Sequence, residues 1–450
     1  MAARLLSRGL DRLRRGGPFL FANLALAVFL LWLIAPLFDN RSRNPWLFGR
    51  YSLPYFSFLV GLVTVVGVII SIALAGAARL NRRLFLGIVA LFIVGEISAR
   101  LRLFGPVSDE LRYVPHPYLV FTVEPHARLT AETLTYGPLD PHLPAREEVT
   151  NELSFRGPVP PAEKGDEYRV IMLGGSTVWG GFPLSRSIAG RLEALFHQEG
   201  RRNVRVYNWG VPGFVSGQEL SLLAHTVSDY RPDLVIVYDG SNDIYSPYSS
   251  DPRPGNPYDW QTQDDPGELH DVTLTKLAAR SSLLTLAFSR FTNNRLDPRR
   301  SEGEALRPGA GYGSEDWRQR IASVYAGNQR KMCAFARGAG FELAVYLQPL
   351  LPFKRPLAPA EESLWNPPEY QSHAGDTYRR IRQAMGGADS FNRGAGCHFF
   401  DLSDIFLNHD EEVYVDFVHV TNDGNGFIAG HIYERLKEAR LSEVTREAGR

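Results

Sequence analysis

Five short apolar runs, spread along residues 168–401, constrain the fold of this chain more than any other feature. Each has the length and the nearly continuous apolar character of a strand that is buried on both faces of a sheet. Segments with the apolar spacing of amphipathic helices lie between them. Strands that alternate with helices predict a parallel sheet with helices on both faces. The expected strands are residues 168–173, 204–208, 234–238, 342–348 and 398–401, and the expected helices are residues 187–197, 218–229, 317–338, 378–385 and 429–439.

The N-terminal region has a different, strongly apolar character. Residues 18–38 form an uninterrupted apolar run that is long enough to span the hydrocarbon core of a bilayer, and no small-residue cleavage site is evident after it. Residues 53–77 form a second such run without a charge. A third run, residues 84–99, is shorter and carries Glu96, so an interfacial amphipathic helix is the alternative. We expect residues 1–104 to be a membrane anchor with about three transmembrane helices.

The arginines around these runs predict the side of the membrane on which the rest of the chain lies. Cytoplasmic loops carry an excess of Lys and Arg. Three spans with a cytoplasmic N-terminus place two arginine clusters inside and the globular region outside, which for a bacterial-type inner membrane is the periplasm. Two spans would place that region in the cytoplasm, and three arginines fall on the disfavoured side in both cases. The clusters are Arg4, Arg8, Arg12, Arg14 and Arg15, then Arg79, Arg82 and Arg83, and the disfavoured residues are Arg41, Arg43 and Arg50.

Charge and cysteine usage exclude several classes of function. The formal net charge is +0 and the pI is about 7.2, so no bulk attraction to nucleic acid is expected. The two cysteines, Cys333 and Cys397, lack the spacing of a zinc site. They could pair in an oxidising compartment or remain two buried thiols. The sequence also lacks a phosphate-binding P-loop and a dinucleotide-binding glycine motif, so we expect neither a metal nor a cofactor.

The part of the chain that follows the apolar region divides into a connector and a main domain. Residues 105–165 are rich in Pro, His and Glu and have little periodicity, so we expect a connector that packs over the domain of residues 166–450. Residues 245–315 interrupt the alternation of strands and helices with dense Pro, Asp, Ser and Gly. We interpret them as an insertion beside the site, with one apolar helical stretch near residues 277–291.

Two glycine-rich segments directly follow the first two expected strands. In Gly174-Gly175-Ser176-Thr177 the glycines allow a sharp turn that presents the serine hydroxyl at the mouth of the sheet, ahead of a helix N-terminus. In residues 208–213 (NWGVPG) a glycine can bring its backbone N–H close to a ligand. Taken alone, each segment is more typical of an ordinary strand-to-helix turn.

Two polar segments complete this set. Residues 239–243 (DGSND) follow the third strand, and the Asn242 amide could donate a hydrogen bond to a developing oxyanion. Asp416 precedes His419 by three residues, which allows a carboxylate to hold Nδ1–H of the ring and leaves Nε2 free to take a serine proton. An Asx turn and a loop histidine are the alternatives for each motif considered singly.

The order Gly-x-Ser, Gly, Gly-x-Asn-Asp, Asp-x-x-His resembles the four sequence blocks of the SGNH/GDSL hydrolase superfamily. The resemblance covers about residues 168–439, and residues 151–157 (NELSFRG) look like the approach segment of its membrane-linked bacterial members. It implies a three-layer α/β/α, flavodoxin-like fold with a parallel five-stranded sheet. Gly175 departs from the pattern, because many members have an aspartate there.

The resemblance also implies roles for individual residues. Ser176 would be the nucleophile and His419 the general base, with Asp416 orienting the ring. The oxyanion hole would consist of the Ser176 and Gly213 backbone N–H groups and the Asn242 side chain. Gly210 is the other candidate for the glycine position.

These residues predict a membrane-anchored serine esterase that acts on an acyl ester, namely an O-acyl (acetyl) group of an envelope polysaccharide or a lipid. An O-acyltransferase of exopolysaccharide modification and a non-catalytic scaffold with this fold are the alternatives. The predicted insertion contains aromatic residues that would suit stacking on sugar rings or would form its local core. These residues are Tyr245, Tyr248, Tyr258 and Trp260.

Overall fold

The computed structural model describes residues 78–100, 113–135, 148–257, 306–386, 391 and 396–441. The chain divides into two compact units, one of residues 109–263 and 298–450 and the other of residues 1–108 and 264–297. In the second unit, only helix α3 (Ala78–Arg100) belongs to the described residues.

The larger unit is built on a parallel sheet of five strands in the order β6-β5-β7-β8-β9. This confirms the predicted parallel sheet. All five expected strands form, within two residues of their predicted bounds, because each buried run is bounded by residues that break the pattern. The strands are β5 (Tyr168–Gly174), β6 (Val204–Gly210), β7 (Leu234–Asp239), β8 (Glu342–Leu347) and β9 (Cys397–Asp401).

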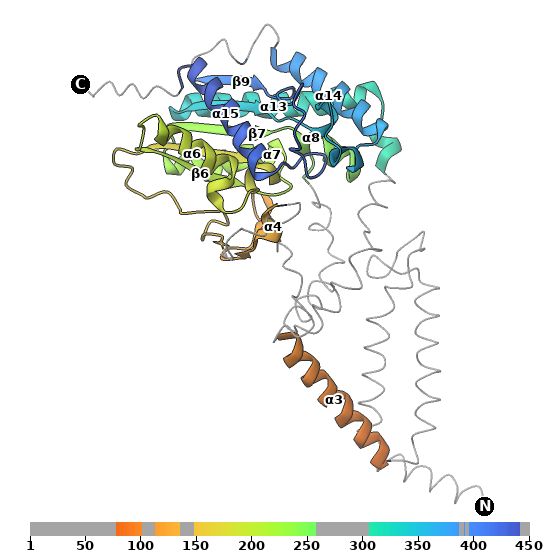
Figure 1. Ribbon diagram of the computed structural model, residues 1–450. Helices are drawn as coiled ribbons and strands as arrows, with labels where there is room; N and C mark the ends of the chain where they lie inside the picture. Colours follow the sequence, from red (N-terminus) through yellow and green to blue (C-terminus); the bar gives the residue numbers. More distant parts are fainter. Residues whose placement is uncertain are drawn as a thin grey trace, which may run out of the picture. The chain divides into compact units, whose positions relative to one another are not determined.

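Helices cover both faces of the sheet, as Figure 1 shows. Alternate residues of a strand point to opposite faces, so Val170 and Met172 pack toward one layer and Ile171 and Leu173 toward the other. The first layer contains α6 (Ile188–Gln198) and α15 (Asn422–Glu438), which contact each other. The second layer contains α7 (Ser216–His225), α13 (Glu315–Ala339) and α14 (Pro368–Gly386).

Two helices begin earlier than the sequence pattern predicts. Helix α14 starts ten residues before the expected Tyr378, and its first turns bury Tyr370, His373 and Ala374 at helical spacing. Tyr and His have polar atoms, so the periodicity there is not evident as an apolar stripe. Helix α15 starts seven residues before the expected residue 429 because Thr421 caps it, accepting a hydrogen bond from Gly424 N at 3.1 Å.

Short strands and a helix precede the domain in the region that we expected to be a connector. Their buried apolar side chains, including Phe121, Val123, Leu129 and Leu134, belong to the same core cluster as the sheet. The elements are β1 (Tyr113–His116), β2 (Val120–Val123), β3 (Arg128–Leu129), α4 (Ala131–Thr135) and β4 (Glu148–Val149).

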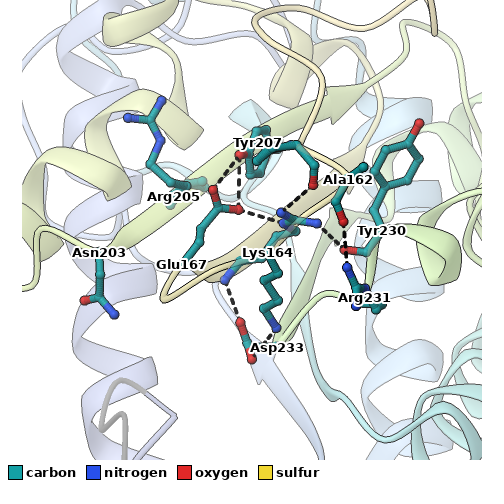
Figure 2. Close-up of polar contacts among 12 residues, drawn as sticks. Ala162, Lys164, Glu167, Asn203, Arg205, Tyr207, Tyr230, Arg231 and Asp233 are labelled. Atoms are coloured by element: carbon teal, nitrogen blue, oxygen red, sulfur yellow. Dashed lines mark hydrogen bonds and ion pairs between the residues drawn. The ribbon is translucent and has the colours of Figure 1, made fainter.

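Polar contacts fix the last residues before β5 to the amino-terminal edge of the sheet (Figure 2). Lys164 forms an ion pair with Asp233 at 2.7 Å, and the Tyr207 hydroxyl donates to Glu167 at 3.1 Å. Arg231 donates to the carbonyl oxygen of Ala162 at 2.6 Å. This edge lies opposite the carboxyl ends of the strands, where parallel sheets place their sites.

Helix α3 covers the third expected membrane segment, residues 84–99. None of the helices within the described residues is both long enough and apolar enough to cross a bilayer. The first two expected spans, residues 18–38 and 53–77, lie outside the described residues, as does the expected helical stretch of residues 277–291.

A disulfide joins Cys333 on α13 to Cys397 at the start of β9, with 5.8 Å between the Cα atoms. It links a helix of one outer layer to an edge strand of the sheet. Of the two alternatives that the sequence left open for these cysteines, the structure has the paired one.

Candidate active site

Ser176, His419 and Asp416 meet at the carboxyl end of the sheet. Ser176 is the first residue of the short helix α5 (Ser176–Trp179), immediately after β5, and His419 lies in the loop before α15. The distance from His419 Nε2 to Ser176 Oγ is 2.7 Å, and the distance from His419 Nδ1 to Asp416 Oδ2 is 2.6 Å. A continuous hydrogen-bonded chain therefore connects carboxylate, imidazole and hydroxyl.

The loop that carries His419 is held by Asp416 itself. Asp416 Oδ1 accepts the backbone N–H groups of Val418 at 2.8 Å and His419 at 2.7 Å. Val415 N also donates to the carbonyl oxygen of His419 at 2.9 Å, which closes the turn. One carboxylate thus fixes both the backbone and the ring of the histidine.

Asp416 is ionised in this arrangement. Burial alone would raise the pKa of its carboxyl group, but the hydrogen bonds from the His419 side chain and from the backbone N–H groups outweigh burial, and the pKa is lowered overall. An ionised Asp416 accepts the Nδ1–H of His419 and thereby leaves Nε2 as the proton acceptor toward Ser176.

The Asn242 side chain lies beside the turn that contains Gly213. Asn242 is in the first turn of α8 (Ser241–Ser249), and its Nδ2 donates to the carbonyl oxygen of Phe214 at 2.8 Å. An amide nitrogen has two hydrogens, so one remains for a further acceptor. Gly213 has a φ of 85°, a left-handed conformation that glycine adopts without strain.

The structure favours Gly213 over Gly210 for the glycine position. The Gly210 N–H donates to Asn208 Oδ1 at 3.2 Å, whereas no acceptor for the Gly213 N–H is found within the described part of the chain. Gly210 has a packing role instead, because a Cβ on it would lie 2.7 Å from the backbone nitrogen of Trp179. Helix α5, which begins with Ser176, therefore packs directly on the end of β6.

An aromatic cluster next to the triad was not predicted from the sequence in this form. Phe417 belongs to the Asp-x-x-His segment. The centroid of its ring lies 4.6 Å from the ring centroid of Tyr245 and 5.3 Å from that of Trp365. Trp365 is 45% exposed. It comes from a proline-containing segment without periodicity, so no sequence signal placed it here.

Tyr248 packs on Tyr370 and the His373 ring, whereas Tyr258 and Trp260 lie outside the described residues.

In the described ranges, no group of three or more His, Cys, Asp or Glu side chains is arranged to hold a metal ion. The groups that the structure brings together at this site are the Ser176 hydroxyl, the His419 imidazole and the Asp416 carboxylate.

No family model and no curated protein has a significant match to this sequence. Solved structures do match. An acetyl xylan esterase is 12% identical over 60% of this chain and 99% of its own, with a TM-score of 0.34. A catalytic mutant of an acetylxylan esterase from Geobacillus stearothermophilus is 12% identical over 60% and 93%, with a TM-score of 0.35. A lipase/acylhydrolase from Enterococcus faecalis is 14% identical over 60% and 96%, with a TM-score of 0.33.

These scores are too low to carry an argument, so the class of the protein rests on its own sheet and site. Ser176 follows β5, and the glycine and asparagine blocks follow the two strands beside β5 in the sheet, β6 and β7. The Asp-x-x-His segment precedes the last described helix. This is the arrangement that the resemblance to the SGNH/GDSL hydrolases implied, and the chain has that fold.

Proposed function

We propose that this protein is a serine esterase in which Ser176 is the nucleophile, His419 the general base and Asp416 the residue that orients the base. The observation that carries the proposal is the unbroken hydrogen-bond chain from Asp416 through His419 to Ser176, with 2.6 and 2.7 Å between the bonded atoms. A serine hydroxyl is too weak an acid to attack an ester unaided, and an adjacent imidazole removes this barrier.

The first step forms an acyl-enzyme. Ser176 Oγ attacks the ester carbonyl carbon while its proton passes to His419 Nε2. The tetrahedral intermediate collapses when the C–O bond to the alcohol breaks, and His419 returns the proton to the departing alkoxide. Asp416 stabilises the imidazolium that exists between these two transfers.

The second step releases the acyl group. A water molecule gives a proton to His419 Nε2 and attacks the acyl carbon, and the bond to Ser176 Oγ breaks as Oγ regains a proton from the imidazolium. The products are a carboxylic acid, the alcohol and the free enzyme. In both steps the negative charge on the carbonyl oxygen is stabilised by the Ser176 and Gly213 N–H groups and by Asn242 Nδ2.

The experiment that tests this proposal is hydrolysis of p-nitrophenyl esters, from acetyl to long acyl chains, by the full-length protein in mild detergent. Ser176→Ala should abolish the activity, and Ser221→Ala, a control on helix α7, should retain it. A serine-reactive fluorophosphonate should label the wild type and not Ser176→Ala.

The three outcomes separate the esterase from its alternatives. Hydrolysis that depends on Ser176 supports the esterase. If Ser176 is labelled but no ester is hydrolysed, the protein would instead be an acyltransferase that needs its own acyl donor. Folded protein without labelling would leave a non-catalytic scaffold.

We further propose that the alcohol part of the ester is a sugar of an envelope polysaccharide rather than a lipid. The exposed ring of Trp365 supports this, because it contacts Phe417 in the segment that carries Asp416 and His419, and a flat aromatic surface there suits a pyranose ring. Trp365→Ala should raise the KM for an acetylated oligosaccharide and leave the KM for p-nitrophenyl acetate unchanged. Equal effects on both substrates would contradict this assignment, and a marked preference for long acyl chains would favour a lipid.

We also propose that the domain is anchored to a membrane and lies on its extracytoplasmic side. The apolar runs at residues 18–38 and 53–77 support the anchor. The disulfide between Cys333 and Cys397 supports an oxidising compartment. Added protease should therefore cleave the domain in intact bacterial spheroplasts, and cleavage only after lysis would contradict the proposal.

A further inference from the structure

Arg156 is a fully buried charged residue that the catalytic steps above do not use. It belongs to the NELSFRG segment that precedes the sheet, and its side chain is 0% exposed. Its Nε and Nη2 atoms donate to Glu148 Oε2 at 3.1 and 2.6 Å. Its Nη1 atom donates to the carbonyl oxygens of Trp179 and of Gly181, the latter at 2.9 Å.

One of these contacts, that with the Trp179 carbonyl oxygen, fixes the end of helix α5. Trp179 is the last residue of α5, and Ser176 is the first. Carbonyl groups at the end of a helix have no partner within the helix, and here a buried guanidinium group supplies one. The position of Ser176 is thereby tied to Arg156 across a single helical turn.

The loop of residues 180–184 also forms hydrogen bonds with the start of α15, close to His419 in the chain. Asn422 accepts the Phe182 N–H at 3.3 Å and donates to the Phe182 carbonyl oxygen at 3.1 Å. Asn422 is the first residue of α15, three positions after His419. Glu148 closes the loop from the other end by accepting the Leu184 N–H at 2.6 Å.

The packing of this loop leaves little room for adjustment. Gly181 has a φ of 92°, and a Cβ on it would lie 2.8 Å from Asn425 Nδ2 and from the Arg186 carbonyl oxygen. Asn425 in turn donates to that carbonyl oxygen at 3.3 Å. The loop therefore contacts α15 closely, and a shift of one displaces the other.

We propose that Arg156 is a positioning residue for catalysis, a role that rests on the proposed function. It holds the end of α5 and the 180–184 loop so that Ser176 meets His419, which the same loop fixes through Asn422. The approach segment of the sequence is thus part of the active-site support. Misplacing a reacting group by about 1 Å can lower a rate by about 100-fold.

The chain contains a matched control for this proposal. Arg169 is also 0% exposed and pairs with a glutamate, Glu167, at 2.6 Å. It also donates to two carbonyl oxygens, those of Tyr230 at 2.5 Å and Pro161 at 2.9 Å. Two of its partners, Glu167 and Tyr230, belong to the network of Figure 2. Arg169 lies at the start of β5, whereas Ser176 follows the end of that strand. Loss of either guanidinium group removes the same kinds of contact.

The test compares Arg156→Gln and Arg169→Gln in the full-length protein. Both variants should lower the thermal unfolding temperature by similar amounts. Only Arg156→Gln should lower kcat on p-nitrophenyl acetate, by about 10- to 100-fold, with the KM changed less than about threefold. Arg156→Lys, which keeps the charge and not the fork of donors, should recover only part of the loss.

Hydrogen exchange provides a readout that does not depend on activity. The amides of residues 176–184 should exchange faster in Arg156→Gln and be unchanged in Arg169→Gln. If Arg156→Gln does not fold, Asn422→Ala should give the same selective loss of kcat from the other side of the loop.

Equal loss of kcat in the two arginine variants, or unchanged kcat with unchanged exchange in Arg156→Gln, would overturn the proposal. A wild-type protein that hydrolyses no ester would instead contradict the proposed function, and the exchange comparison would then decide the positioning role alone.

Discussion

The side-chain amide of Asn242 lies directly against Gly175, so that a Cβ on residue 175 would overlap Asn242 Nδ2. The amide is also fixed by its bond to the carbonyl oxygen of Phe214, at 2.8 Å. Asn242 thus contacts the residue before Ser176 and the residue after Gly213, the two residues whose N–H groups are the other expected oxyanion donors. In this structure, a side chain at position 175 would displace the amide from its present place.

Gly175→Asp should therefore lower kcat by about 10- to 1,000-fold, since it moves one oxyanion donor. Gly175 has a φ of −86°, so the backbone itself tolerates a side chain and the effect is steric. Steady-state kinetics on p-nitrophenyl acetate measure it. Gly327→Ala, in helix α13 with open space at the Cβ position, is the control and should retain full activity. If Gly175→Asp has the kcat of the wild type, turnover does not depend on the present position of the Asn242 amide.

Asn242→Ala should lower kcat by about 100- to 1,000-fold, or about 3–4 kcal/mol of transition-state stabilisation, with little change in the KM. Among the described residues, its side chain makes one hydrogen bond, to the carbonyl oxygen of Phe214, so the fold should persist. Circular dichroism and thermal unfolding verify the fold, and pre-steady-state acylation rates measure the loss. Undiminished turnover would remove Asn242 from the mechanism.

The free energy of unfolding should depend on the protonation of His373. Burial lowers the pKa of its imidazole from 6.5 to about 4, against the opposing hydrogen bond to the Ile244 carbonyl oxygen. The unfolded chain binds this proton below pH 6.5 and the folded chain does not, so this contribution to stability is lost as the pH falls from 6.5 toward 4. The loss should be about 2 kcal/mol at pH 5.

Urea unfolding at pH 7.5 and pH 5 measures this dependence. His373→Gln removes the titrating group, so the variant should lose about 2 kcal/mol less than the wild type between the two pH values. Identical pH dependence in the two proteins would show that His373 titrates alike in the folded and unfolded states.

Removal of the disulfide should destabilise the larger unit. Cys333 and Cys397 are separated by 64 residues in the sequence, and a crosslink over a loop of that size contributes up to about 4 kcal/mol by restricting the unfolded chain. The double variant Cys333→Ala, Cys397→Ala should therefore unfold at a clearly lower urea concentration and keep its kcat, because neither residue is near Ser176 in the site. Reductant should reproduce the shift in the wild type and leave the variant unaffected. If the wild type unfolds at the same urea midpoint with and without reductant, the disulfide does not contribute to the free energy of unfolding.

The sequence predicted the sheet well because its strands are buried on both faces and therefore consist of continuous apolar runs. It predicted helix starts less well where polar groups or glycine interrupt the pattern, as at Tyr370 and Gly424. The sequence does not predict the position of Trp365, because that position depends on a ring contact with Phe417 that no spacing in the chain indicates. The sequence shows Arg156 only as part of a motif, because the two carbonyl groups that it binds beside Ser176 belong to residues 23 and 25 positions away in the chain.

By itself, the sequence determined the alternation of strands and helices and the order of the polar segments that follow the strands, because both depend on local chemistry and on spacing. Only the tertiary structure decided three further features. Gly210 N–H has an acceptor, whereas Gly213 N–H has none among the described residues. Cys333 meets Cys397, and the Asn242 amide lies against Gly175. Each of these depends on distances between segments that are far apart in the chain, and such distances are set by the packing of the layers.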